Sequence, residues 1–476
     1  MDRIAIDENG IPGYTLMRRA GAEAVRVARS RFPEATRWQV ICGSGNNGGD
    51  GYVVARLAAL DGIVVTVLTL VDVGTLTGDA AAAYSDFAAA GGIVSPWAGD
   101  LDPEAELLVD AMLGSGLERD VSGEFADAVA AINAHSAKVH AMDIATGING
   151  DTGAVMGHAV IADLTTTFVG LKAGLFLGAG PNHCGVITYS DLDIGEDCRA
   201  GILPIYQRMD DHLLATALPP RNRDAHKGDF GHVLVVGGGH GMPGAALLCG
   251  EAALRAGAGR VSIATHSEHA ASIAAARPEL MSHGISAAKD LTPLLDKADV
   301  VAFGPGLGQS EWARELFRLL AEDDRPAVWD ADALNLLAAE PSIAGNRVIT
   351  PHPGEAAMLL GENAADIQAD RPAALHALAA KYGGITVLKG AGTLVKADAD
   401  SPFVCSSGNP GMAAPGMGDV LTGVIAALLA QGLTTSSAAI CGVEIHARAG
   451  DLAAASGERG LLASDLIGAL RSVVNP

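Results

Sequence analysis

The sequence predicts an α/β protein built from two domains. Short runs rich in β-branched residues alternate with alanine-rich stretches of helical pattern through most of its 476 residues. This length exceeds that of one ordinary domain. The alternation is interrupted over residues 195–231, where the chain is charged, contains a Pro-Pro pair and has no clear period. We therefore expect a first domain over residues 1–205 and a second over 206–476.

In the first half, short β-branched runs predict strands, and helices are expected between the early ones. The helical stretches cover residues 15–32 and 76–92, and the first carries apolar side chains at helical spacing, including Leu16, Ala20 and Ala24. The expected strands cover residues 37–42, 63–70, 106–110, 138–143, 164–170 and 185–192.

The alternation restarts after the interruption, and the last sixty residues are mostly helical. The motifs of the two halves do not correspond, so the sequence indicates two different α/β domains and no duplication. The expected strands of the second half cover residues 232–239, 260–265, 298–306, 326–332, 347–352 and 385–390.

Composition excludes several classes of partner. The net charge of −23 and the isoelectric point near 4.9 argue against nucleic acid and against an anionic membrane surface. Six scattered cysteines without a C-x-x-C pair indicate neither a disulfide framework nor a zinc site, and favour a reducing cytoplasm. The charged N-terminus is not expected to be a signal peptide, and apolar runs such as residues 423–430 are shorter than a membrane span.

The stretch "GSGNNGG" (43–49) matches the G-x-G-x-x-G pattern of dinucleotide-binding loops. We expect a loop here, followed by a helix through "YVVARLAA"; a tight turn without a ligand would give the same pattern. Asp50, expected at the start of that helix, counts against a pyrophosphate cradle because its carboxylate would repel the phosphates. The side-chain oxygens of Asn46 and Asn47 suit a hard cation or a polar ring substituent better.

Two later strands also end in polar residues. Asp110 ends one strand and is followed by a glycine-rich loop, and Asp143 ends the next, followed by Thr146. Ligands of open parallel sheets gather at the carboxyl ends of strands. We therefore expect Asn47, Asp110 and Asp143 to converge on one site.

Four motifs, at residues 43–51, 110–116, 143–153 and 167–180, together resemble the NAD(P)H-hydrate epimerase family over about residues 14–190. The resemblance implies a Rossmann-like three-layer α/β fold, interconversion of the R and S forms of NAD(P)H hydrate, and a bound K⁺. The family's usual Pro-Ser is Ala145-Thr146 here, which keeps a hydroxyl and a carbonyl for the cation. Carried over, the metal ligands fall on Asn47, Asp110 and Thr146, the acid/base on Asp143, and substrate contacts on Asn46, Asn47, Gly48, Gly49, Asp50 and Gly114.

In the second half, "NPGMAAPGMGDVLTG" (409–423) runs from a glycine-rich loop into a long apolar helix. The amides and the helix dipole form an anion hole. Asp419 is expected at the helix start, where it can accept a proton from a hydroxyl while the amides stabilise a transferring phosphoryl group. A capping aspartate would account for Asp419 but not for the two turns before it.

This pattern resembles the ribokinase-like superfamily. Together with residues 226–239, 304–308, 330–337, 350–360, 387–395 and 457–466, it is most similar to its ADP/ATP-dependent NAD(P)H-hydrate dehydratase branch. The resemblance implies phosphorylation of the hydrate's hydroxyl followed by loss of phosphate. Asp419 then becomes the base and a substrate contact, and Ala245, Gly308 and His352 line the hydrate pocket. The nucleotide contacts fall on Lys389, Gly390, Ala391, Gly392, Thr393 and Gly418.

Several points stay open at the sequence level. His352 is equally well interpreted as a structural turn histidine. Mg²⁺ is expected for phosphoryl transfer, with Glu355 as the nearest ligand. Pro415 replaces a usual glycine and removes one amide donor. ADP is the expected donor by resemblance, although the loop chemistry does not distinguish ADP from ATP.

The resulting expectation is a bifunctional metabolite-repair enzyme, epimerase and dehydratase in one cytoplasmic chain, acting on small molecules as a homo-oligomer. A vitamin or sugar kinase with a Rossmann appendage is the first alternative, but it leaves Asn47, Asp110 and Asp143 without a role. The second alternative is an N-terminal half that only binds a ligand or acts as a scaffold.

Overall fold

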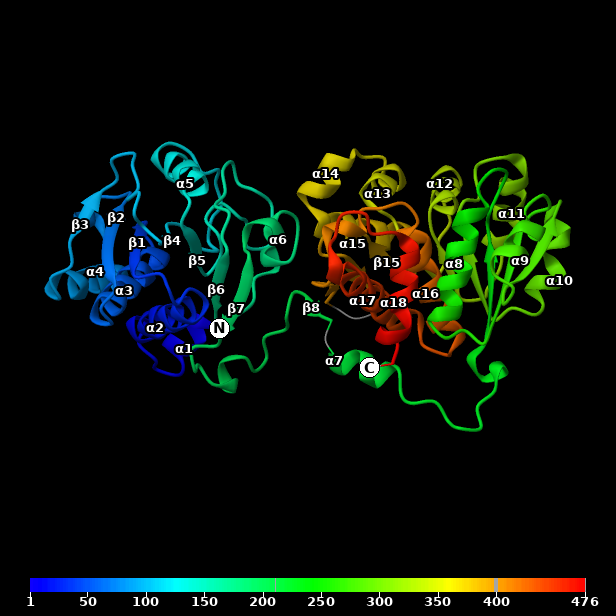
Figure 1. Ribbon diagram of the computed structural model, residues 1–476, viewed down its shortest axis with the longest axis horizontal. Coiled ribbons are helices and arrows are strands. Elements are labelled where there is room, and N and C mark those ends of the chain that lie inside the picture. The colour runs from blue at the N-terminus through cyan, green and yellow to red at the C-terminus, as the bar shows by residue number, and fades with distance from the viewer. Residues whose placement is uncertain (210, 398–400, 476) are drawn as a thin grey trace. The chain divides into compact units, whose positions relative to one another are not determined.

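The structure, a computed structural model, describes residues 1–209, 211–397 and 401–475. The chain forms two compact units, Met1–Leu203 and Pro204–Pro476. Each unit is an α/β fold around a largely parallel sheet with helices on both faces (Figure 1). The α/β class predicted from the alternating pattern is therefore confirmed.

The sheet of the first unit has seven parallel strands in the order β3-β2-β1-β4-β5-β6-β7. Six of them lie where the β-branched runs predict strands. The seventh, β3, is a three-residue edge strand that contains a proline, and it is too short for a periodic pattern to reveal. The strands are β1 (Arg37–Cys42), β2 (Val64–Thr69), β3 (Val94–Pro96), β4 (Leu107–Ala111), β5 (Lys138–Met142), β6 (Leu164–Phe168) and β7 (Val186–Ser190).

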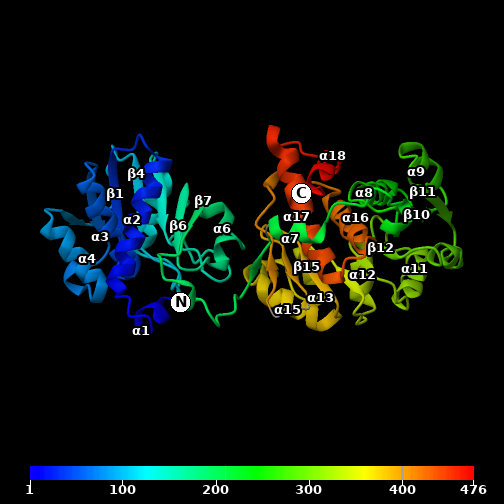
Figure 2. The same cartoon turned by 90° about the horizontal axis from the view of Figure 1, so that it is seen from below.

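Helices cover this sheet on both sides. The helices α2, α3 and α4, labelled in Figure 2, pack on one face with Val40 and Cys42. The helix α5 packs on the other face with Ile41 and Leu108, as strand alternation requires. The helices are α1 (Asp2–Asp7), α2 (Gly13–Arg31), α3 (Asn46–Leu60), α4 (Gly78–Ala89), α5 (Glu124–Ala134) and α6 (Gly180–His183).

The expectation that residues 43–49 form a loop is wrong, because α3 begins at Asn46 with Gly45 as its N-cap. The glycines of this stretch allow the helix to pack closely. A Cβ on Gly48 would lie 2.1 Å from the carbonyl oxygen of Gly43, and one on Gly51 would lie 2.6 Å from the Cβ of Ala111. Two glycines of the G-x-G-x-x-G pattern, Gly43 and Gly48, therefore allow close packing, whereas a Cβ on Gly45 would have no atom within 4 Å.

The strand order of this sheet reverses beside β1. The chain runs outward from β1 to β2 and β3 and then returns to β4 on the other side of β1. The loops that leave β1 and β4 consequently diverge and leave a crevice at the carboxyl ends of the strands.

The sheet of the second unit has ten strands in the order β11-β10-β9-β12-β13-β14-β15-β16-β17-β8. The six predicted strands are present. The unpredicted ones are two or three residues long (β8, β16, β17) or a half-exposed edge (β11), so they lack a recognisable pattern. The strands are β8 (Gln207–Arg208), β9 (His232–Val236), β10 (Arg260–His266), β11 (Met281–Ile285), β12 (Val300–Phe303), β13 (Ala327–Trp329), β14 (Arg347–Ile349), β15 (Ile385–Leu388), β16 (Leu394–Lys396) and β17 (Phe403–Val404).

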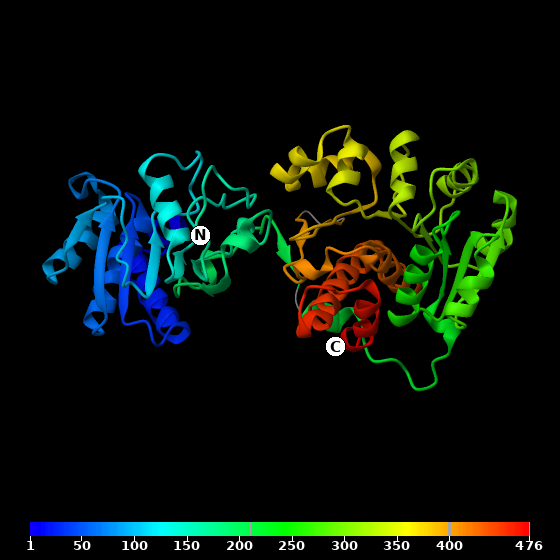
Figure 3. The same ribbon diagram turned by 45° about the horizontal axis from the view of Figure 1, so that its top comes forward.

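The helices α8, α16, α17 and α18 share one apolar core on one face of this sheet. Figure 3 shows the orange and red helices on one side of the strands and the yellow ones on the other. Among the described residues, no helix has both the length and the apolar character that crossing a membrane requires. The helices are α7 (Asp211–Ala217), α8 (Pro243–Arg255), α9 (Ala270–Ala276), α10 (Thr292–Leu295), α11 (Glu311–Ala321), α12 (Asp332–Ala339), α13 (Pro353–Leu360), α14 (Ala364–Ala369), α15 (Arg371–Tyr382), α16 (Met417–Ala430), α17 (Thr435–Ala453) and α18 (Ala463–Val473).

This second sheet has its own reversal of strand order, between β9 and β12. The glycine-rich loops that follow these two strands, residues 237–242 and 304–308, therefore border its crevice. Both units thus present a switch point at the carboxyl ends of their strands.

Candidate active sites

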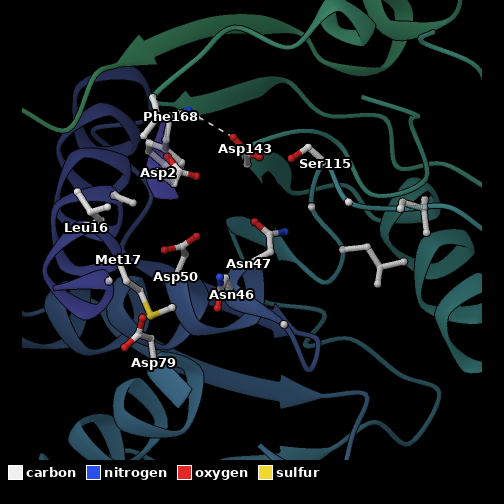
Figure 4. A pocket seen from close by; sticks show the side chains of 18 of the residues that line it. Asp2, Leu16, Met17, Asn46, Asn47, Asp50, Asp79, Ser115, Asp143 and Phe168 are labelled. Carbon is white, nitrogen blue, oxygen red and sulfur yellow. Dashed lines mark hydrogen bonds between the residues drawn. The ribbon is translucent and has the colours of Figure 1, made fainter. Parts of the chain in front are cut away.

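The switch point of the first unit opens into a cavity of about 860 Å³. Loops that follow β1, β4, β5 and β6 line it, together with α1 and α2. In Figure 4, the side chains of Asn47, Asp50 and Asp143 point into the same space. Asn46 and Gly114 also line this cavity, whereas Gly48 and Gly49 are buried in the helix packing beneath it.

Asp143 directly follows β5 and has a left-handed backbone with φ of 65°. Its Oδ1 accepts hydrogen bonds from Thr167 Oγ1 at 3.2 Å and from the Phe168 amide at 3.3 Å, and it forms an ion pair with Lys172. Lys172 also donates to Thr167 Oγ1 and to the carbonyl of Phe168. Non-glycine residues in this backbone region are strained and cluster at functional sites. The carboxylate is therefore held in one orientation at the cavity wall.

Asp110 and Thr146 lie together below the cavity, and both are fully buried. The Asp110 carboxylate accepts bonds from the Thr146 amide at 2.8 Å, from the Thr146 hydroxyl at 2.7 Å and from the Met112 amide at 3.2 Å. Burial raises the pKa of Asp110 to about 6, and the bonds from Thr146 oppose that shift. The family resemblance placed these two residues in one ligand set, and they are in contact here. The expectation that Asp110 shares one site with Asn47 and Asp143 is met only in part, because Asp110 is not among the residues that line the cavity with them.

Asn47 supplies an unsatisfied group at the same edge. Its side chain is 8 % exposed, and neither its Oδ1 nor its Nδ2 has a hydrogen-bond partner among the described residues. A Cβ on Gly114 would lie 3.4 Å from the Cβ of Asn47, so the loops after β1 and β4 approach each other here. A buried amide without a partner is costly unless a ligand satisfies it.

Asp50 lies in the second turn of α3, not at the helix start, so the premise that it blocks the helix N-terminus is wrong. Burial, followed by the negative charges of Asp143 and Asp2, raises the pKa of Asp50 well above its ordinary value. Because Asp50 lies outside the first turn of α3, its position does not block the amides of that turn from an anionic ligand.

In the second unit, one lysine is surrounded by carboxylates from different elements. Lys389 follows β15, and its Nζ lies 2.6 Å from Asp330 Oδ1 and 3.6 Å from Glu355 Oε2. Asp330 follows β13, is 2 % exposed and accepts a hydrogen bond from Thr422 Oγ1 at 2.9 Å. These charges raise the pKa of Lys389 and lower that of Asp330, in each case against burial.

Asp419 lies in the first turn of α16, as the sequence predicts. Burial and then the negative charge of Asp330 raise its pKa to about 7, while Lys389 acts in the opposite direction. The helix starts after Gly416, whose φ of 89° makes the sharp entry possible. A Cβ on Gly418 would lie 3.2 Å from both Asp330 Oδ2 and Lys389 Nζ, so the absence of a side chain there leaves the charged groups close together.

The predicted nucleotide loop, Lys389 to Thr393, is exposed at Gly390 and Ala391. A buried arginine holds it from behind: Arg371 donates to the carbonyls of Leu388 and Lys389 at 3.2 Å and of Gly392 at 3.3 Å. Because the arginine takes up these carbonyls, the loop keeps a fixed shape.

The predicted hydrate contacts Ala245 and Gly308 both lie at the β9–β12 switch point. Gly306 is in the same loop as Gly308, and a Cβ on it would lie 3.0 Å from the Cβ of Ala245. The Gly308 amide donates to Asp332 Oδ2 at 2.8 Å. His352 caps α13: its Nδ1 accepts from the amides of Gly354 and Glu355, so a structural role is present. Its side chain is still half exposed, and its Nε2 lies 3.6 Å from Glu355 Oε1.

Comparison with known families matches each unit separately. Residues 13–174 match the model described as YjeF-related protein N-terminus, and residues 233–471 match NAD(P)H-hydrate dehydratase. A Coxiella burnetii protein named "Bifunctional NAD(P)H-hydrate repair enzyme Nnr" is 47 % identical over 100 % of this chain and 98 % of its own length. The chain belongs to the bifunctional NAD(P)H-hydrate repair enzyme family. The protein of the same name from Escherichia coli K12 is 46 % identical over 100 % of this chain and 92 % of its own.

Solved structures agree for the C-terminal unit of this repair enzyme. The ADP/ATP-dependent NAD(P)H-hydrate dehydratase of Bacillus subtilis, co-crystallised with ATP/Mg²⁺, is 31 % identical with a TM-score of 0.51, over 55 % of this chain and 95 % of its own. A ribokinase-like superfamily protein from Enterococcus faecalis gives a TM-score of 0.54 at 28 % identity, over 58 % of this chain and 97 % of its own. The ribokinase-like fold predicted from residues 226–466 is confirmed.

Sequence reasoning missed three charged residues of this repair enzyme. Lys172, Asp330 and Arg371 received no role, although the first two lie inside quoted motifs. The available signal for Lys172 was a single charge in the apolar, glycine-rich stretch 167–180. Arg371 has no local signal, because its partners are carbonyls about twenty residues further along the chain.

Proposed function

We propose that the first unit interconverts the R and S forms of NAD(P)H hydrate and that the second converts the S form to NAD(P)H with ADP, giving AMP and phosphate. The observation that carries this proposal is common to both units. In each unit the carboxylate proposed for proton transfer is under the influence of a lysine. Asp143 forms an ion pair with Lys172, and Asp419 is affected electrostatically by Lys389, whose own ion-pair partners are Asp330 and Glu355. The two relatives named bifunctional NAD(P)H-hydrate repair enzyme match over 98 % and 92 % of their own lengths, which supports the proposal.

In the first unit, Asp143 is the proton-transfer group for epimerisation at the hydroxylated ring carbon. Lys172 orients it through the ion pair, and Thr167 and the Phe168 amide fix the same oxygen. The first turn of α3 faces the cavity through Asn46 and Asn47, which supports binding of the dinucleotide's phosphates by helix amides. Gly114 lies beside Asn47, and its lack of a side chain leaves room for the ring. Gly48 and Gly49 act indirectly, because their small size lets α3 approach the loop after β1 and the helices α2 and α4.

The residues Asn47, Asp110 and Thr146 fit a K⁺ ion. Asn47 Oδ1 is buried without a partner, Asp110 contributes a buried negative charge, and Thr146 adds hydroxyl and carbonyl oxygens beside it. Oxygen donors with one carboxylate suit a hard cation. The ion would supply charge compensation to Asp110, and these residues hold the loop after β4 at the cavity.

In the second unit, Asp419 takes the proton from the hydrate's hydroxyl as that oxygen attacks the β-phosphoryl group of ADP. Amides at the start of α16, including that of Gly418, and Lys389 stabilise the phosphoryl charge. The phosphate then leaves with the ring oxygen as the neighbouring carbon loses a proton, which restores the dihydronicotinamide. A pKa near 7 suits Asp419 to proton transfer at neutral pH.

Mg²⁺ fits the carboxylates beside Lys389. Asp330 and Glu355 offer hard oxygen donors within reach of the lysine, and Mg²⁺ commonly uses one or two carboxylates together with substrate phosphates. The ion would neutralise charge on the phosphates. Loop residues Lys389 to Thr393 hold the nucleotide; Ala245, Gly308 and the Nε2 edge of His352 contact the hydrate.

A hydrate assay with ADP and ATP in parallel tests the function. Separated R and S NADH hydrate are incubated with the intact chain and Mg²⁺, and recovery of dihydronicotinamide absorbance is followed. We expect both forms to be recovered, the S form faster, and ADP to be the better donor. If neither form yields NADH with either nucleotide, the repair function is refuted. Phosphorylation of a vitamin or sugar hydroxyl by the same protein would favour a kinase.

A further inference from the structure

Three potential metal ligands meet at the carboxyl ends of β9 and β10 in the second unit. They are His240, on the loop after β9, His266, the last residue of β10, and Glu268 in the turn that follows. Their ligand atoms all lie within 4.8 Å of one another. We refer to these three residues as the His-His-Glu cluster.

The distances within the cluster converge on Glu268. Its Oε2 lies 2.9 Å from His240 Nδ1 and 3.9 Å from His266 Nδ1. Ligands about 2 Å from a shared ion are separated by about 3–4 Å, so a small rotation of the exposed His240 would bring all three into a coordination sphere. Two imidazoles and one carboxylate form a ligand set typical of divalent transition metals.

The surroundings of His266 indicate a ligand site and not only a surface ion pair between His240 and Glu268. Its Nδ1 is buried and has no hydrogen-bond partner among the described residues. Its ring packs edge-on against Trp312 at a centroid distance of 5.8 Å, which fixes the ring plane. An exposed pair of His240 and Glu268 would contribute little to stability and would leave this nitrogen unsatisfied. A metal ion satisfies it.

A neighbouring histidine, His269, supports the position of the cluster. His269 Nε2 accepts a hydrogen bond from the Gly241 amide at 3.1 Å, immediately after His240. This bond holds the loop that presents His240, as outer residues commonly do around metal ligands. The ring of His269 also lies 6.1 Å from that of His266.

We infer that the His-His-Glu cluster binds one divalent transition-metal ion, with Zn²⁺ as the probe. This site shares no ligand with the proposed nucleotide Mg²⁺ site, and two of its three ligand atoms are nitrogens. An ion here ties the loop after β9 to the turn after β10. That loop continues into Met242, whose Cε would lie 3.4 Å from a Cβ on Gly308, so the ion stiffens one wall of the switch point.

The test is a calorimetric titration of the full chain with ZnCl₂. The protein is first treated with EDTA and then kept in excess KCl and MgCl₂, which occupy oxygen-ligand sites without displacing a metal bound by imidazoles. His240→Ala and His266→Ala are compared with His376→Ala, a matched control that removes an exposed histidine of α15. His240 is 80 % exposed, so its replacement leaves the fold intact.

We expect one Zn²⁺ per chain in the wild type and in His376→Ala, and an affinity more than about tenfold weaker in His240→Ala and His266→Ala. Zn²⁺ should also raise the melting temperature of the wild type but not of His240→Ala. The same binding isotherm in wild type and His240→Ala, or no binding to the wild type, would overturn the inference.

Discussion

The two units place their sites alike but surround the reactive carboxylate differently. In the first unit Asp143 is tied to Lys172 and to a backbone amide, in a strained but fixed position. In the second unit Asp419 shares Lys389 with Asp330 and Glu355, and its pKa is raised to about 7. Two α/β units with a switch point thus surround the two proposed proton-transfer carboxylates with different charges, and neighbouring charges help to set the pKa of a carboxylate.

The glycines near the starts of α3 and α16 also have different structural roles. Those of α3 allow the helix to lie against β1 and β4, where Gly48 and Gly51 have no room for a side chain. Gly416 instead provides a left-handed backbone at the start of α16. A glycine-rich sequence before a helix therefore does not by itself distinguish packing from anion binding.

Asp419→Asn should give the largest effect. The amide cannot accept the hydroxyl proton, so we expect recovery of NADH from the S form to fall about 10³–10⁴-fold, while interconversion of the two forms is unchanged. Chromatography of the two hydrates and of NADH measures both reactions. Asp296→Asn, a change at an exposed aspartate, is the matched control. A loss of less than tenfold would remove Asp419 as the base.

Asp143→Asn should affect only the first unit. We expect interconversion to fall about 10²–10³-fold, because proton transfer is lost while the fold remains. The S form should still be converted to NADH at the wild-type rate, and the R form should remain unconverted. Chromatography of the residual hydrate shows this, and normal consumption of both forms would exclude Asp143 from epimerisation.

The pH dependence of the S-form reaction should follow the pKa of Asp419. Asp419 acts as a base when deprotonated, so kcat/KM for the S form should be level above its pKa near 7 and fall about tenfold per pH unit below it. The profile is measured with the intact chain at saturating ADP and Mg²⁺. A profile that stays level down to pH about 5 would show that the free enzyme does not use a base with this pKa.

Gly48→Ala should give the smallest change in chemistry but a measurable loss of stability. The added methyl meets the Gly43 carbonyl, and we expect unfolding of the first unit to become easier by about 1–3 kcal/mol. Gly45→Ala is the matched control, since a Cβ there has no atom within 4 Å. Urea unfolding followed by hydrogen exchange in β1 and α3 measures the difference. Equal stability of the two variants would contradict the packing role.

The fold was largely predictable from sequence because buried parallel strands are continuous apolar runs. The strand-end argument predicted that Asn47, Asp110 and Asp143 converge, and Asn47 and Asp143 do line one cavity, whereas Asp110 is buried and does not line it. The contact of Asp110 with Thr146 was implied only by the family resemblance. The start of α3 was not predictable, because asparagine and glycine favour turns and only packing against β1 makes the stretch helical. Arg371 was not predictable either, since backbone carbonyls brought near by folding satisfy it.

Residue roles in both sites and the expected homo-oligomer stay predictions. The ADP preference also stays a prediction. Pro415 affects the nucleotide loop, because proline removes one amide donor from the segment before α16. Exchange of Pro415 for glycine would restore that donor.

The central claim is that each unit contains a complete and separate site. Mixing the Asp143→Asn and Asp419→Asn proteins tests it directly, with pure R hydrate, ADP and Mg²⁺. We predict that neither variant alone recovers NADH from the R form at an appreciable rate. The mixture should do so, because the S form made by one protein diffuses to the other. A mixture as inactive as its components, although each retains its remaining activity, would contradict the claim.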